Sequence, residues 1–140
     1  MAMSATYLHL VPEQRLPDLP GTEPFRAVVI LDAAPSSTWR HTVSKWLVDA
    51  HCLYAVVCGK NSAEWDDAID FANIEKFNFE RIPDRGVVMT TWHDSEPLAE
   101  AFWFAKNNAH HQTVTLSRTL LVHVSAAPAE ASVLRAFTEA

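Results

Sequence analysis

Glycine is scarce in this chain, and its scarcity excludes two common kinds of ligand site. The 140 residues include three glycines, Gly21, Gly59 and Gly86, and none stands in a GxGxxG or GxxxxGK[ST] motif. Both motifs hold phosphate through backbone amides that glycine-rich turns expose, so we do not expect nucleotide binding by either of them. The Gly59-Lys60 step ahead of a predicted helix can hold an anion, but an ordinary turn explains it more readily.

Cysteine is equally rare, which argues against disulfides and zinc sites. Cys52 and Cys58 are the only two, and both fall at one predicted strand. Six residues of extended chain at about 3.3 Å each separate them by roughly 20 Å, far beyond the reach of a disulfide. There is neither a CxxC pair nor a Cys/His zinc pattern. We therefore expect two small buried apolar side chains, and no metal or cofactor.

Basic residues are few and scattered, which argues against a nucleic-acid partner. Eleven Lys and Arg stand against 17 Asp and Glu, giving a net charge of -6. Affinity for nucleic acid depends on clustered Lys and Arg that neutralise phosphates. A basic protein partner fits this acidic chain better.

Long apolar runs are also missing. No segment approaches the roughly 20 apolar residues that cross a bilayer, and the N-terminus has no basic region followed by an apolar core. We therefore expect a cytoplasmic protein that does not bind membranes. The hydrophobic content of 49% in 140 residues is that of one globular domain.

Apolar runs alternate with helical patterns, which predicts a three-layer α/β domain with a mostly parallel sheet of four or five strands. This architecture is flavodoxin-like or minimal Rossmann-like. Numbering the expected strands along the chain, we expect the order 2-1-3-4 across the sheet. The orientation of the last strand, parallel or antiparallel, stays open. The domain spans 25–126, between an extended segment at 1–24, in which 7–11 can add an edge strand, and a tail at 127–140 with a marginal helix. The four expected strands are 26–32, 53–58, 87–92 and 119–125.

Polar and aromatic residues follow two of these strands, where an open parallel sheet binds its ligands. The chain lacks a complete catalytic set, and acidic residues beside tryptophan make good anchors for a protein partner. The leading hypothesis is a non-catalytic interaction module, of immunity or regulatory type, that binds through this acidic and aromatic edge. The predicted binding residues are Lys60, Trp65, Asp66, Asp67, Trp92, His93 and Asp94.

Two other functions stay open. Asp32 and His93 are the candidate catalytic pair of a small hydrolase or nucleotide-processing enzyme, provided that their side chains approach within about 3 Å. No serine stands in a nucleophile elbow, and neither cysteine has an obvious activating partner. A homo-oligomer is the third possibility, because Phe102, Trp103 and Phe104 make the helix after the third strand apolar around much of its circumference.

The remaining histidines do not suggest a metal site. His110 and His111 should close a helix at the opposite edge of the sheet from His93, and His123 should pack inside the last strand. The turn at Trp92 and His93 is the most informative segment. If it binds a partner, both side chains should be partly exposed at the mouth of a pocket, and if it only packs, both should be buried.

The stretch from Pro24 to Ser125, about three-quarters of the chain, resembles a family of small bacterial α/β proteins known only as a domain of unknown function. The resemblance implies a bacterial source and supplies no activity or catalytic residue. It rests on the segments 24–29, 46–49, 65–67, 89–93, 102–106 and 109–111.

Overall fold

The computed structural model describes residues 4–19, 21 and 23–140, which form one five-stranded sheet flanked by four helices. All four strand pairings are parallel, so the last strand is parallel too. The elements are β1 (Ser4–Leu10), β2 (Phe25–Leu31), α1 (Ser37–Asp49), β3 (Cys52–Gly59), α2 (Ser62–Lys76), the 3-10 turn η1 (Asp84–Gly86), β4 (Met89–His93), α3 (Leu98–Asn107), β5 (Arg118–Val124) and α4 (Glu130–Glu139).

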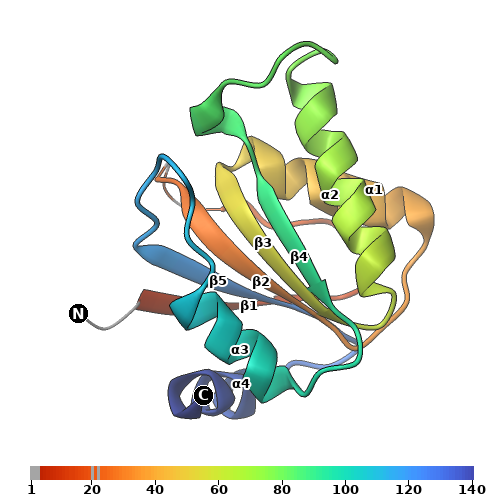
Figure 1. The fold of residues 1–140 in the computed structure, drawn as a ribbon. Coiled ribbons are helices and arrows are strands. Elements are labelled where there is room, and N and C mark those ends of the chain that lie inside the picture. Colours follow the sequence, from red (N-terminus) through yellow and green to blue (C-terminus); the bar gives the residue numbers. More distant parts are fainter. Residues whose placement is uncertain (1–3, 20, 22) are drawn as a thin grey trace.

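The helices cover both faces of the sheet, which confirms the predicted three-layer α/β architecture and is consistent with a flavodoxin-like fold (Figure 1). One apolar cluster lies between the sheet and α1 with α2, where Trp39, Leu47 and Trp65 are buried. A second lies under α3 and α4, around Phe102 and Phe137. Within the described part of the chain, no helix is long and apolar enough to cross a membrane.

The strand order is β1-β5-β2-β3-β4, and the predicted order is wrong. The prediction placed β4 beside β2, whereas β4 pairs with β3 and β5 pairs with β2. Right-handed crossovers explain the observed order. The connections from β2 to β3 through α1 and from β3 to β4 through α2 run in the same direction across the sheet, so both helices lie on one face. The connection from β4 to β5 through α3 runs back past β3 and β2, so α3 lies on the other face.

The proline-rich segment between β1 and β2 packs on the α1 side, which the sequence predicted only as an extended surface segment. Two tryptophans of α1 hold it. The indole N–H of Trp39 donates to the carbonyl of Gln14 at 2.9 Å, and that of Trp46 donates to the carbonyl of Pro17 at 2.9 Å. These two tryptophans are therefore structural.

Neither α2 nor α3 begins with a side-chain cap. Asn61 precedes α2 with a left-handed φ of 57° and makes no side-chain cap. Glu64, three residues after Asn61, accepts a hydrogen bond from Arg40 at 3.1 Å. At α3 the residue before the helix is Pro97, and neither Asp94 nor Ser95 caps it.

Candidate functional site

Polar side chains gather at the carboxyl end of the sheet, on the side that α3 and α4 cover. The strand register places His9, His123, Ile30, Cys58 and His93 in one row across all five strands. Ile30 and Cys58 belong to the apolar cluster under α3 and α4. Because register neighbours in a parallel sheet face the same side, the three histidines face that side as well.

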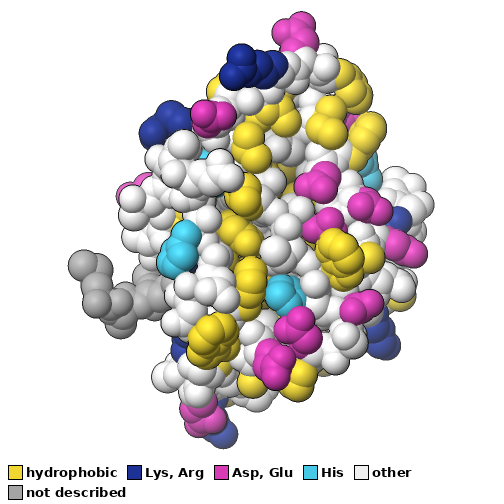
Figure 2. All heavy atoms as spheres, viewed as in Figure 1, with side chains coloured by type: hydrophobic (Ala, Val, Ile, Leu, Met, Phe, Trp, Pro, Cys, Tyr) yellow, Lys and Arg dark blue, Asp and Glu magenta, His cyan; other side chains and the backbone are white. Residues whose placement is uncertain are grey.

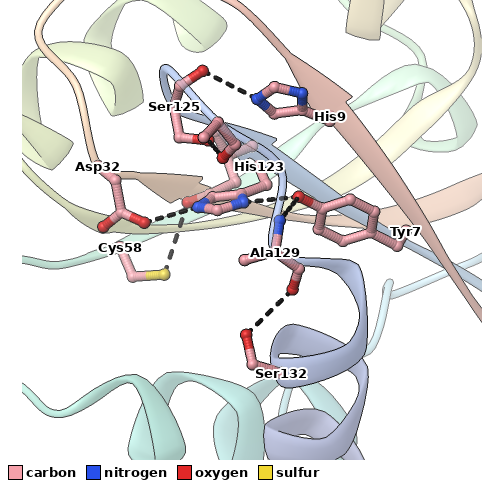
Figure 3. A network of polar contacts seen from close by, with 10 residues as sticks. Tyr7, His9, Asp32, Cys58, His123, Ser125, Ala129 and Ser132 are labelled. Carbon is pink, nitrogen blue, oxygen red and sulfur yellow. Dashed lines mark hydrogen bonds and ion pairs between the residues drawn. The ribbon is translucent and has the colours of Figure 1, made fainter.

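Asp32, His123, Tyr7 and the amide of Ala129 form a continuous hydrogen-bonded chain, called the polar chain below (Figure 3). His123 Nε2 lies 2.6 Å from Asp32 Oδ2, and Nδ1 lies 2.7 Å from the Tyr7 hydroxyl. The Tyr7 hydroxyl in turn accepts the Ala129 N–H at 2.9 Å. Because the Tyr7 hydroxyl accepts from Ala129, its own proton is free to be donated to Nδ1, which leaves Nε2–H to donate to the carboxylate of Asp32.

The polar chain joins the ends of four elements, because Tyr7 belongs to β1, His123 to β5, Asp32 follows β2 and Ala129 precedes α4. The His123 side chain is 5% exposed, whereas that of Asp32 is 64% exposed. Both ring nitrogens of His123 are therefore engaged inside the protein, Tyr7 is partly buried, and the carboxylate of Asp32 faces solvent. This arrangement is suited to holding β1 and α4 on the sheet, and His123 has no free nitrogen to offer a substrate.

Cys58 lies beside this chain but is not a nucleophile. Burial and the nearby Asp32 carboxylate raise the pKa of its thiol to about 12. Burial likewise raises the pKa of Cys52 to about 12. Both cysteines are free and buried, as the sequence predicted. Since the thiolate is the reactive form, neither side chain supplies covalent chemistry at neutral pH.

The structure does not bring His93 and Asp32, the predicted catalytic pair, together. His93 Nδ1 lies 3.2 Å from Glu96 Oε2, and Nε2 lies 3.1 Å from the Thr91 hydroxyl. Its ring packs against Phe104 at a centroid distance of 4.9 Å. Because β3 separates β2 from β4, the backbones at the two positions are about two strand spacings, or roughly 10 Å, apart. The partner of Asp32 is His123 instead.

Three of the predicted binding side chains, Trp65, Asp66 and His93, are buried in the protein. Trp65 is 1% exposed and packs edge-on against Trp39, so it belongs to the core. His93 is 7% exposed, whereas its neighbour Trp92 is 52% exposed. The expectation that Trp92 and His93 share one environment is wrong, because adjacent residues of a strand point to opposite faces.

Trp92 lies on the α2 side of β4, beside a group of carboxylates. The contacts between the two elements run in order: the Val88 N–H donates to Asn73, and the Thr90 hydroxyl donates to Asp70 at 3.0 Å. Two residues further along β4, Trp92 therefore lies level with the first turns of α2, which carry Asp66 and Asp67.

The carboxylates of Asp66, Asp67 and Asp70 lie close enough to repel one another. Burial raises the pKa of Asp70, and the charges of Asp66 and Asp67 raise it further, against a hydrogen bond from Thr90 that lowers it. Asp66 is buried, and its Oδ1 atom has no hydrogen-bond partner among the residues that the structure describes. An approaching cation would relieve this repulsion.

Large apolar side chains are exposed around the carboxylates. The view of Figure 2 looks onto β4 and shows acidic side chains over α2 beside apolar ones. Besides Trp92, Phe71 and Ile74 of α2 and Phe79 just beyond it are exposed, and the Phe71 ring packs against His41 of α1 and against Phe79. We call Trp92, Asp66, Asp67 and Asp70 the acidic-aromatic face.

Lys60 and Asp94 are the residues that directly follow β3 and β4. Both side chains are exposed. Lys60 follows Gly59, whose φ is 101° and where an added Cβ would stand 2.4 Å from the carbonyl oxygen of Leu31. The positive φ and the close approach to Leu31 require glycine at this turn. A single glycine before Lys60 does not make a phosphate-binding loop.

The expected self-association surface on α3 is mostly core. Phe102 is fully buried, and Phe104 packs on Tyr54 and His93, so only Trp103 is exposed. A single exposed aromatic residue is ordinary for a protein surface. Beyond the helix, His111 does not close α3 but contacts the carbonyl of Val87 at 2.7 Å.

The chain belongs to the family described as a domain of unknown function, DUF7684, whose model matches residues 5–140. The match includes β1 and α4, and therefore the whole polar chain. No curated protein and no solved structure matches the chain.

Proposed function

We propose that the protein is a non-catalytic, cytoplasmic interaction module that binds a basic, extended segment of a partner protein along the edge of β4. The observation that carries the proposal is the position of the exposed Trp92 on the outermost strand, beside the carboxylates of α2. Three features support it: an open strand edge, an aromatic anchor and a charge that selects the partner.

The strand edge supplies the backbone contacts. β4 is the last strand of the sheet order and pairs with β3 alone. Among the turn, loop and cap hydrogen bonds of the described residues, none involves the backbone of Met89–His93. An extended peptide can therefore add to this edge through main-chain hydrogen bonds, while alternate side chains contact the two flanking helices.

The aromatic side chains supply affinity. Trp92 has about half of its surface exposed. Covering roughly 100 Å² of it at about 25 cal/mol per Å² contributes about 2.5 kcal/mol, which is close to a hundredfold in binding. Trp92 is thus the expected hot spot of the interface.

The carboxylates supply specificity. Asp66, Asp67 and Asp70 are close enough that their charges interact, and the whole chain carries a net charge of -6. Lysine or arginine of a partner segment would relieve the repulsion, whereas an acidic segment would increase it. A basic segment is therefore the occupant that the charges favour.

A hydrolase or nucleotide-processing enzyme has less support from the geometry. Asp32 is bonded to His123, whose second nitrogen is also engaged, and the neighbouring Cys58 stays protonated. No side chain of the polar chain combines access to solvent with the ability to act as an activated nucleophile.

Selection of binding peptides from a library of random dodecapeptides tests the proposal. We expect the selected peptides to be enriched in Lys and Arg that alternate with apolar residues. Trp92→Ala should weaken their binding at least tenfold, and the double substitution Asp67→Asn, Asp70→Asn should weaken it severalfold and reduce its salt dependence. Each Kd is measured by isothermal titration calorimetry on variants whose unfolding has been checked.

Matched controls separate this face from general effects. Trp103→Ala removes an equally exposed tryptophan from α3, and Glu130→Gln with Glu139→Gln removes two charges from α4. Both controls should bind like the wild type. Selection of neutral or acidic peptides, equal losses in the controls, or no selected peptide at all would refute the proposal.

A further inference from the structure

A pocket opens at the opposite end of the sheet from the polar chain, where β2 and β3 begin and where α1 and α2 end. It has a volume of about 240 Å³. Its floor is formed by apolar residues, of which Val48, Cys52, Leu53 and Val88 are buried and Val114 is partly buried. The Cys52 thiol adds no charge to this floor, since burial raises its pKa to about 12. We call this space the amino-end pocket.

Basic side chains surround the amino-end pocket. His51, Lys76 and Arg85 line it, all three are exposed, and no Asp or Glu lines it. Within the described part of the chain, the guanidinium of Arg85 makes no hydrogen bond or ion pair. This is a local excess of positive charge in a chain whose net charge is -6.

The helix ends near the pocket oppose this positive charge but do not cancel it. The carboxyl end of a helix carries the equivalent of about half a negative charge. Lys76 already donates to the carbonyl of Val48 in the last turn of α1, at 3.3 Å. The two full charges of Lys76 and Arg85 therefore exceed the two partial charges of α1 and α2, and the opening of the pocket favours an anion.

We propose that the amino-end pocket binds a small organic monocarboxylate with a compact apolar body, such as an aromatic or branched-chain acid. The volume lies below the roughly 300 to 1,000 Å³ of pockets for larger ligands, so a nucleotide does not fit. An apolar floor gives no partner to a bare inorganic ion. The guanidinium of Arg85 can hold the carboxylate through two parallel hydrogen bonds while the apolar body enters the pocket.

This site is independent of the proposed interaction along β4, because the two surfaces share none of their residues. It is tested on the whole chain by following backbone amide shifts during titration with benzoate, phenylacetate and isovalerate. At least one acid should give saturable shifts at residues 51–53, 85–88 and 114. Benzamide, which has the shape of benzoate without its charge, should bind at least tenfold more weakly.

Substitutions assign the contact. Arg85→Ala should weaken binding of the acid at least tenfold, Arg85→Lys should restore only part of it, and Arg81→Ala, at an exposed arginine outside the pocket, should change nothing. The inference is wrong if none of the three acids gives saturable shifts, if benzamide or inorganic phosphate binds as well as the acids, or if the shifts lie outside the pocket.

Discussion

Removing one oxygen atom from the polar chain should cost far more stability than its size suggests. The change is Tyr7→Phe, which keeps the ring and deletes the hydroxyl. That hydroxyl accepts the Ala129 N–H at the start of α4 and donates to Nδ1 of the buried His123. The substitution therefore leaves two polar groups without partners, one on the helix and one in the core.

The expected cost follows from these two losses. A buried donor or acceptor left without a partner costs about 1 to 3 kcal/mol, and a helix N–H that water can reach costs less. We expect Tyr7→Phe to lower the free energy of unfolding by about 2 to 3 kcal/mol, a large share of the roughly 5 to 15 kcal/mol of a typical domain. Asp32→Asn should cost less than about 1 kcal/mol, because the 64% exposed carboxylate leaves room for water to replace it.

Urea unfolding followed by circular dichroism measures both values, and hydrogen exchange at the Ala129 amide locates the effect. Faster exchange at this amide and along α4 should accompany the loss of stability in Tyr7→Phe. A cost below about 0.5 kcal/mol for Tyr7→Phe, or an equal cost for the two variants, would show that the polar chain does not hold α4 on the sheet.

Three further predictions follow from burial and backbone geometry. With thiol pKa values of about 12, Cys52 and Cys58 should not react with a disulfide reagent at pH 8 in the folded protein, whereas both should react in denaturant; rapid labelling of the native chain would contradict this. Asp70→Asn should stabilise the protein by a few tenths of a kcal/mol at pH 7, because the raised pKa of Asp70 means that the folded state disfavours its charge. This gain should appear as pH rises through about 4, where Asp70 ionises in the unfolded chain, and should vanish near pH 3; a constant gain at all pH values would disprove the electrostatic cause. Gly59→Ala should cost more than about 2 kcal/mol in thermal unfolding, since its Cβ would stand 2.4 Å from the carbonyl oxygen of Leu31, and a neutral result would contradict the turn geometry.

The sequence predicted the elements well, because they depend on local patterns. The apolar runs that became β2, β3 and β5 are buried along almost their whole length, as expected for strands covered on both faces. The helical spacing of the buried residues of α2 includes Trp65, which lies in the core. Its inclusion among the binding residues conflicted with that spacing.

The site could not be predicted because it depends on strand order. His123 meets Asp32 only because β5 lies beside β2, and Tyr7 reaches His123 only because β1 adds beyond β5. No local pattern in a single sequence specifies these neighbours. The alternation of side chains along β4 was a usable signal: it separates His93, which faces α3, from Trp92, which faces α2.

The most direct test of the interaction surface is amide hydrogen exchange of β4 in complex with a basic peptide selected for binding. If the peptide adds to the sheet, the amides of Met89–His93 that face away from β3 should become protected, and Trp92 should lose solvent exposure. Protection of the peptide and of other surfaces, with unchanged exchange along Met89–His93, would contradict binding at this edge.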